Sequence, residues 1–135
     1  MDWLQRLQEA GFQRAGSWSL GDFGPVCDIN QHASASPVLY AFVCEKQVLY
    51  VGKTARTLRK RMYNYERPGP SQRTSLANHA NLRHYLEDGR AVELWVFVDD
   101  LGLEFGGFRV SLAAGLEDAL IATIRPPWNK MGASG

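Results

Sequence analysis

The stretch "VLYAFVCEKQVLYVGKTARTLRKR", residues 38–61, decides the fold. It contains two short apolar runs, residues 38–43 and 48–52, separated by a charged turn. Runs of β-branched and aromatic residues with a turn between them are typical of an antiparallel hairpin. Thr54 or Thr57 then caps a basic helix, because a threonine hydroxyl accepts a hydrogen bond from the first helical turn. The stretch therefore predicts two paired strands followed directly by a helix.

Each of the two predicted strands carries a tyrosine, Tyr40 and Tyr50. Side chains alternate between the two faces of a strand, so the length of the loop decides whether the two rings share a face. A two-residue loop places the rings on opposite faces. Pairing of Val43 with Gln47 around a three-residue loop places Tyr40 directly opposite Tyr50. We expect an odd-length loop or a bulge, which puts both hydroxyls on one face.

The rest of the chain predicts a small sheet with helices packed on it. Further helices are expected from Asp2 to Gly11, over residues 75–88 and from Ser111 to Arg125, with a third strand over residues 91–100. Residues 12–36 predict an irregular arm with one short strand, and residues 102–109 predict a loop. The fold class is α/β (α+β), with a small three-stranded, mainly antiparallel sheet flanked by helices.

Two charged residues lie in otherwise apolar helical stripes. Arg61 is in register with Leu58, Met62 and Tyr65, and Glu117 is in register with Leu120, Ile121 and Ile124. A guanidinium that faces inward is costly unless it meets an anion. That anion is either a bound phosphate or, in the alternative interpretation, the Glu117 carboxylate in a structural ion pair.

Composition places few limits on function, but the distribution of charge is informative. Hydrophobic content is 45%, charged content is 21% and the formal net charge is +1. Residues 53–90, however, carry nine Lys/Arg and three acids. Such asymmetry favours a basic face that attracts a polyanion, with a solvated helical surface as the alternative. Cys27 and Cys44 are expected to be free thiols in a reducing compartment.

The sequence predicts neither a signal peptide nor a membrane span. We therefore expect a cytoplasmic protein of bacterial or phage type.

Phosphodiester hydrolysis needs a base for the attacking water, a cation for the phosphate and, in most enzymes, a divalent metal. The sequence offers a candidate for each role. Tyr40 or Tyr50 takes the proton, Arg61 binds the phosphate and Glu117 holds the metal. Which tyrosine is the base stays open.

These residues stand in an order that resembles the GIY-YIG nuclease superfamily. Tyr40 in "VLY" and Tyr50 in "YVG" occupy the two motif tyrosines, and Lys53, Arg61 and Tyr65 follow at the family's spacing. Downstream, "GLEDALIATIRPPWN" is similar to the family's glutamate helix with its trailing asparagine, at Glu117 and Asn129. The spacing is similar to that of the nuclease domain of the bacterial excision-repair incision subunit and of GIY-YIG homing and restriction endonucleases. The first motif lacks its glycine, and Tyr65 stands where many members have histidine.

The resemblance covers residues 37–130 and implies a GIY-YIG-like nuclease domain. Residues 1–36 are then an N-terminal helix and arm, and residues 131–135 a flexible tail.

The implied activity is a metal-dependent DNA endonuclease in repair, restriction, a mobile element or interbacterial antagonism. One Mg²⁺ (or Mn²⁺) is held by Glu117. Tyr40 is the general base, with its pKa lowered by the metal and by Lys53 or Arg61, and Tyr50 orients the water or the phosphate. Tyr65 is part of the pocket, and Asn129 either touches DNA or ties the chain end to the site.

The implied partner is DNA, duplex or branched. The candidate backbone contacts are Arg56, Arg59, Lys60, Arg67, Arg73, His79 and Arg83. Trp95 and Phe97 are expected in the core rather than on a stacking surface. A catalytically inactive binding module of the same fold is the alternative function, and a homodimer or a partner protein docked through residues 1–36 is also considered.

Overall fold

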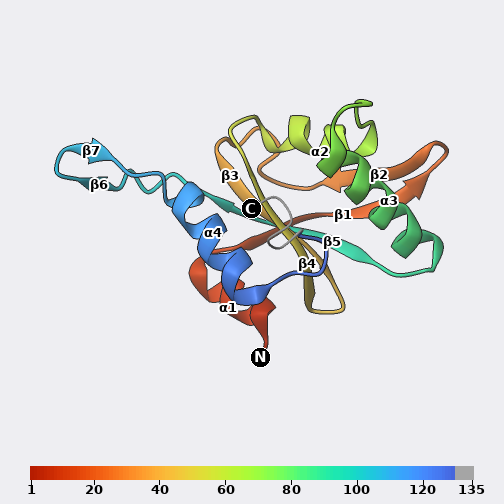
Figure 1. Ribbon diagram of the computed structural model, residues 1–135, viewed down its shortest axis with the longest axis horizontal. Coiled ribbons are helices and arrows are strands. Elements are labelled where there is room, and N and C mark those ends of the chain that lie inside the picture. The colour runs from red at the N-terminus through yellow and green to blue at the C-terminus, as the bar shows by residue number, and fades with distance from the viewer. Residues whose placement is uncertain (130–135) are drawn as a thin grey trace.

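A five-stranded antiparallel sheet forms the centre of the protein, whose computed structural model describes residues 1–129 (Figure 1). The strand order is β2-β1-β5-β3-β4. Its strands are β1 (Gln13–Gly21), β2 (Gly24–Ile29), β3 (Val38–Cys44), β4 (Gln47–Thr54) and β5 (Val92–Val98). The helices are α1 (Trp3–Ala10), α2 (Leu58–Glu66), α3 (Arg73–Glu87) and α4 (Leu112–Ile124).

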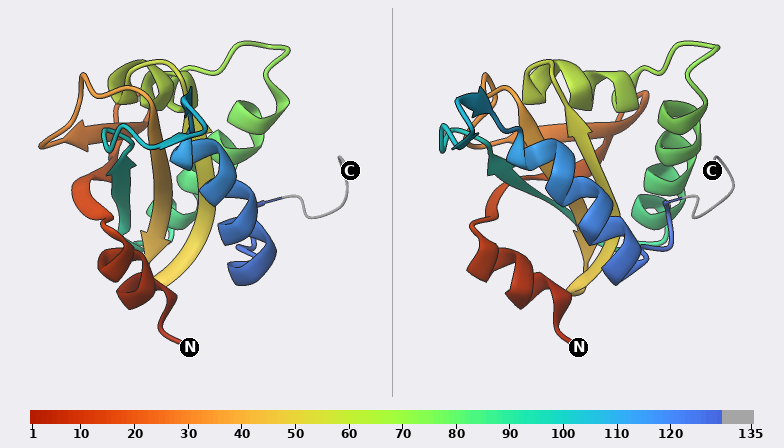
Figure 2. Two further views of the ribbon diagram at one scale, coloured as in Figure 1. Left: turned by 90° about the vertical axis from the view of Figure 1, so that its left-hand side faces the viewer. Right: turned by 60° about the vertical axis from the view of Figure 1, so that its left-hand side comes forward.

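The helices cover both faces of the sheet, which gives three layers (Figure 2). Helices α2 and α3 enclose one core, in which Met62 and Leu82 pack against the sheet. Helices α1 and α4 enclose the second core on the other face. Trp95 and Phe97 lie in this second core, 8% and 7% exposed, as the sequence predicted. Among the described residues, no helix combines the length and the apolar character needed to cross a membrane.

The hairpin of β3 and β4 contains the bulge that the two tyrosines require. Its turn has only two residues, Glu45 and Lys46, both with positive φ. The register then shifts after Phe42, and this leaves Leu49 as the extra residue of β4. The shift restores the parity that a two-residue turn would lose, so both tyrosines point into the same core. The bulge was predicted, but direct opposition was not correct, because Tyr40 pairs with Gly52.

The sheet has five strands, not the three that were predicted. Residues 13–29, expected as part of an irregular arm, form the β1–β2 hairpin, and β1 pairs with β5. A bulge between Arg14 and Gly16 hides this strand in the sequence, because two neighbouring residues, Ala15 and Gly16, are both buried. At Gly16 an added Cβ would lie 2.1 Å from the carbonyl oxygen of Asp28. The close approach of two backbones therefore explains the glycine.

A second correction concerns residues 102–109, which were predicted to be a loop. They contain a two-stranded hairpin, β6 (Glu104–Phe105) and β7 (Phe108–Arg109), that projects away from the sheet (Figure 1). The predicted helix caps agree with the structure. The side chains of Asp2, Thr57 and Ser111 accept hydrogen bonds from the first turns of α1, α2 and α4.

Candidate active site

Three tyrosine side chains meet between β3, β4 and α2. Tyr40 and Tyr65 share a hydrogen bond of 2.6 Å between their hydroxyl oxygens, and Tyr50 packs beside both rings with centroids 6.2 and 6.4 Å away. Gly52 makes room for this arrangement. A Cβ at this position would lie 2.7 Å from the hydroxyl oxygen of Tyr40 and 2.9 Å from the ring of Tyr50. The glycine of the second motif is therefore a steric requirement of the tyrosine pair.

Arg61 reaches this cluster from α2 and is held by three neutral oxygens. Its Nε donates to the Tyr40 hydroxyl at 3.1 Å, and one terminal nitrogen donates to the Tyr65 hydroxyl at 2.8 Å. The other terminal nitrogen donates to the Ser75 hydroxyl at 3.0 Å. The guanidinium also lies over the Tyr65 ring, 4.2 Å from its centroid.

Arg61 makes no ion pair with any acid of residues 1–129, so the structural pair with Glu117 is not formed. Burial alone lowers the pKa of Arg61, but the oxygens of Tyr40 and Tyr65 outweigh it and raise the pKa above its ordinary value. The group therefore keeps its positive charge.

Glu117 reaches the site from α4, on the other face of the sheet. Its carboxylate pairs with Lys53 of β4, with 3.7 Å between Nζ and Oε1, while the neighbouring Asp118 is exposed. Burial raises the pKa of Glu117, against the lowering effect of Lys53. Burial raises the pKa of the Tyr50 phenol, and the negative charge of Glu117 makes a smaller contribution in the same direction. Strand β4 therefore connects the two groups of candidate residues, since it carries both Tyr50 and the Lys53 that pairs with Glu117.

The protein's own groups do not lower the pKa of the phenols, whereas the expected lowering also involved a bound metal. Burial raises the pKa of Tyr40, and the proximity of Tyr50 adds to this increase. Arg61 and the bond to Tyr65 act in the lowering direction but are outweighed. Burial also raises the pKa of Tyr50 and Tyr65. The protein's own charges thus leave all three hydroxyls protonated at neutral pH.

The carboxylate of Glu117 is the group that could hold a metal. Within residues 1–129 no cluster of three or more His, Cys, Asp or Glu side chains is arranged for an ion. A single partly buried carboxylate beside an ammonium group fits Mg²⁺, which keeps several waters and is commonly bound through one or two carboxylates and a substrate phosphate. It does not fit a metal that needs a full set of protein ligands.

Asn129 ties the end of the described chain to β4. Its side-chain amide accepts from the Val51 backbone N–H at 3.0 Å and donates to the Val51 carbonyl at 2.9 Å. The backbone N–H of Trp128 donates to the Leu49 carbonyl at 2.8 Å. Asn129 thus occupies the edge of the strand next to Tyr50 and Gly52. Two roles were predicted for Asn129, a DNA contact or a tie between the chain end and the site. The observed contact corresponds to the tie.

The candidate DNA-contacting cations fall into two groups. Arg56, Lys60 and Arg73 are exposed. The other four are partly or fully exposed, and their side chains also contact other residues of the protein. Arg59 donates to the Cys27 carbonyl, Arg67 lies over the Phe23 ring, His79 bonds the Tyr65 carbonyl, and Arg83 donates to the Phe23 carbonyl and pairs with Glu87.

Sequence reasoning missed Ser75, because its role depends on a contact between two helices. It is 3% exposed and lies on the buried side of α3, where its hydroxyl orients Arg61. A buried serine in a helical pattern gives no distinctive signal. Only the odd inward arginine of α2 indicates that a polar partner must exist nearby.

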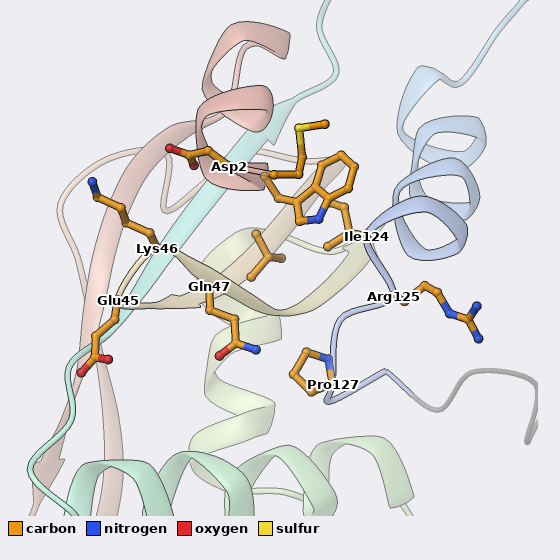
Figure 3. A pocket seen from close by; sticks show the side chains of 10 residues that line it. Asp2, Glu45, Lys46, Gln47, Ile124, Arg125 and Pro127 are labelled. Atoms are coloured by element: carbon orange, nitrogen blue, oxygen red, sulfur yellow. The ribbon is translucent and has the colours of Figure 1, made fainter.

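A separate cavity of about 450 Å³ lies at the other end of the β3–β4 hairpin (Figure 3). The start of α1, the Glu45–Lys46 turn and the segment after α4 line it, and none of the candidate site residues does. The charged ends of Glu45, Lys46 and Arg125 point in different directions. This cavity therefore lacks the convergent polar groups of a binding site.

Two solved structures have a similar fold. A mutant of bacteriophage T4 EndoII aligns with a TM-score of 0.72 and 22% identity, over 96% of this chain and 99% of that one. The restriction endonuclease Hpy188I in complex with product DNA aligns with a TM-score of 0.56 and 12% identity, over 100% of this chain and 87% of that one. The fold is GIY-YIG-like. Its sheet has five strands. The amino-acid sequence of the chain matches no family model and no curated protein.

Proposed function

We propose that the protein is a metal-dependent endonuclease that hydrolyses DNA phosphodiester bonds. The observation that carries this proposal is Arg61, a partly buried cation held by Tyr40, Tyr65 and Ser75 and paired with no acid of the described chain. Three neutral oxygens orient the guanidinium but leave its charge uncompensated. Such an arrangement favours a bound anion, and a planar guanidinium suits a phosphate.

The tyrosine pair provides the base in this proposal. The Tyr40 oxygen accepts a hydrogen bond from Arg61 and can accept a second from the Tyr65 hydroxyl. Both donors stabilise the phenolate form of Tyr40, which then takes the proton of the attacking water. Arg61 neutralises the charge that develops on the phosphate, and Lys53 adds a second cation. Tyr50 packs beside both rings of this pair and, in this proposal, orients the water or the phosphate.

Glu117 is the residue that would hold one Mg²⁺ or Mn²⁺. When bound, such an ion supplies Lewis-acid stabilisation of charge on the phosphate and a lower pKa for bound water. The raised pKa of Glu117 means that the carboxylate must lose its proton before it can bind the ion, so metal affinity falls as pH decreases.

DNA is the proposed substrate because one structural neighbour was solved with product DNA. The exposed cations Arg56, Lys60 and Arg73 provide positive charge just before α2, on α2 and at the start of α3. Contacts of this kind make affinity fall as salt concentration increases.

The test is nicking of plasmid, linear, branched and single-stranded DNA, and of RNA, with Mg²⁺ or Mn²⁺. Arg61→Ala and Glu117→Ala are each expected to reduce the rate by about 10²-fold or more, since each removes a group that stabilises transition-state charge. Both variants should keep salt-sensitive DNA binding. Arg14→Ala and Glu93→Ala, which remove the partners of a different ion pair in the fold, are matched controls and should cut normally.

Two outcomes would contradict the proposal. Wild-type protein that binds DNA but cuts no substrate with either metal would favour the inactive binding module of the same fold. Cleavage that persists in both Arg61→Ala and Glu117→Ala would place the chemistry at another site.

A further inference from the structure

The projecting β6–β7 hairpin has one apolar face and one polar face. Phe105 pairs with Phe108, and the Val110 backbone N–H donates to the Leu103 carbonyl at 2.8 Å. Because paired residues lie on the same side of a two-stranded ladder, these four side chains share one face. The next pair along, Glu104 with Arg109, points to the opposite face. We call Leu103, Phe105, Phe108 and Val110 the apolar hairpin face.

The apolar hairpin face is exposed to solvent in the single chain. Phe105 and Phe108 are 82% and 78% exposed, and Leu103 and Val110 are 41% and 39% exposed. Together with Leu101 at the root, these side chains expose on the order of 500 Å² per copy, most of it from the two aromatic rings. This is near the upper end of what single soluble domains expose in one patch. A two-stranded hairpin alone in water is also only marginally stable.

The root of the hairpin is fixed to the body. Asp99 is 5% exposed, and its carboxylate accepts a hydrogen bond from the Ala113 backbone N–H at 3.0 Å. This bond joins the segment before the hairpin to the first turn of α4 after it. Figures 1 and 2 show the hairpin directed outward from the N-terminal end of α4, with its tip away from the sheet. The apolar hairpin face is therefore presented for contact with another molecule.

Charge argues against DNA as that molecule. Residues 99–110 carry three acids and one cation. Binding to phosphates needs clustered cations, and these lie instead on α2 and at the start of α3. The apolar hairpin face is better matched by another apolar surface that carries no negative charge where the two touch. The same face of a second copy is such a surface, because its four side chains are uncharged and Glu104 and Arg109 lie on the opposite face.

We propose that β6–β7 is a dimerisation hairpin whose apolar face packs against the same face of a second copy of this chain. In a two-fold arrangement the phenylalanines at one tip meet the smaller Leu103 and Val110 of the other copy, so large side chains face small ones. The two copies together would bury about 1,000 Å², which reaches the lower limit of specific interfaces. This interface is an alternative to the expected docking through residues 1–36, of which residues 13–29 are paired within the sheet.

The proposal goes beyond the nuclease activity and does not depend on it. Its test is sedimentation velocity of the full chain over a range of protein concentrations, without DNA or metal. Wild type is expected to sediment as a dimer. Phe105→Ser/Phe108→Ser is expected to raise the dissociation constant of the dimer by about 100-fold or more, because aromatic anchors dominate small interfaces.

Phe23→Ser is the matched control, since Phe23 is 81% exposed at the turn of the β1–β2 hairpin and lies outside the proposed interface. It should leave the dimer intact. Leu103→Arg is a second variant, which keeps the tip and places a charge on the apolar hairpin face. Circular dichroism checks that each variant is folded.

A wild-type protein that is monomeric at its highest soluble concentration would overturn the proposal. So would a dimer that both hairpin variants retain. If the wild type is monomeric and the Phe105→Ser/Phe108→Ser variant binds DNA more weakly than the wild type, the proposal is overturned in favour of a DNA-contacting hairpin.

Discussion

Arg61 shows how a single residue is prepared for an anion without being neutralised by one. Tyr40, Tyr65 and Ser75 each accept one hydrogen bond from a different guanidinium nitrogen. The orientation is fixed, because three bonds to a planar group leave little rotational freedom. A lysine ammonium also has three donors, but all of them radiate from one nitrogen, so it does not reproduce this contact from three nitrogens of a planar group. The three neutral acceptors explain why a charged residue is tolerated in an otherwise apolar stripe.

At the same scale, Tyr40 predicts the pH dependence of cleavage. Its pKa is raised above the ordinary value of about 10, and the base must be deprotonated, so the active fraction is small at neutral pH. This fraction grows about tenfold per pH unit below the pKa. We therefore expect initial rates, measured at fixed ionic strength and saturating Mg²⁺, to rise through the neutral and alkaline range.

Tyr40→Phe should lose this slope and about 10²-fold or more in rate. Tyr63→Phe is the control, because Tyr63 is 53% exposed on α2, away from the cluster. An unchanged slope in Tyr40→Phe would assign the titration to another group.

At the scale of elements, side-chain and backbone groups from elsewhere in the chain occupy positions on both edges of the main sheet. On β4, Trp128 and Asn129 occupy the outward backbone groups of Leu49 and Val51. On β2, the Cys27 backbone N–H donates to Glu66 at 2.9 Å, and its carbonyl accepts from Arg59. Unpaired strand edges are templates for pairing with other chains. The capped edges make strand addition to this sheet unfavourable.

Asn129→Ala tests this role of the chain end. The variant leaves the Val51 N–H and carbonyl without their partners, and we expect a loss of about 1–3 kcal/mol in the free energy of unfolding. Urea denaturation measures it, with exposed Asn30→Ala as the control. Cleavage should also slow, because Tyr50 and Gly52 flank the released residue. A variant with unchanged stability but weaker DNA binding would instead indicate a DNA contact by Asn129.

Strands β3, β4 and β5 were predictable because their apolar runs are continuous. The strand β1 was not, since its bulge breaks the alternation at Ala15 and Gly16. The β6–β7 hairpin carried a signal that was missed. Gly106 and Gly107, both with positive φ, form a two-residue turn between Phe105 and Phe108. Tyr40, Arg61 and Glu117 could be proposed as site residues from motif spacing, whereas contacts between helices, such as that of Ser75, need the fold.

At the scale of the whole molecule, the tyrosine cluster is part of the main core as well as of the candidate site. Tyr40 and Tyr65 are 1% and 0% exposed, and they pack with Phe42 and Trp18 around the centre of the sheet. The same burial that stabilises the core raises the pKa of the phenols. The proposed catalytic chemistry and the global stability therefore depend on the same hydroxyls.

This coupling predicts alkaline unfolding. The folded-state pKa of Tyr40, Tyr50 and Tyr65 is raised, while the unfolded value is about 10. Their contribution to stability is thus fully present below about pH 10 and is lost as pH rises toward the folded-state pKa. Burial also raises the pKa of Cys27, so this thiol acts in the same direction from about pH 8.5.

The measurement is the free energy of unfolding in urea at about pH 8 and about pH 11. It is made in a Cys27→Ala background to remove the thiol contribution. The loss at high pH should be smaller when Tyr40→Phe is added. A stability that stays constant over this range would contradict the assigned burial of the phenols.

The bulge of the β3–β4 hairpin limits which insertions and deletions this chain can tolerate. The turn of Glu45 and Lys46 and the extra residue Leu49 together fix the distance along the chain between the two motif tyrosines. Loss of one residue from this segment would rotate one tyrosine to the other face, whereas a change of two residues would preserve the relation. Relatives with an intact site should therefore differ in hairpin length by even numbers, unless they gain or lose a compensating bulge.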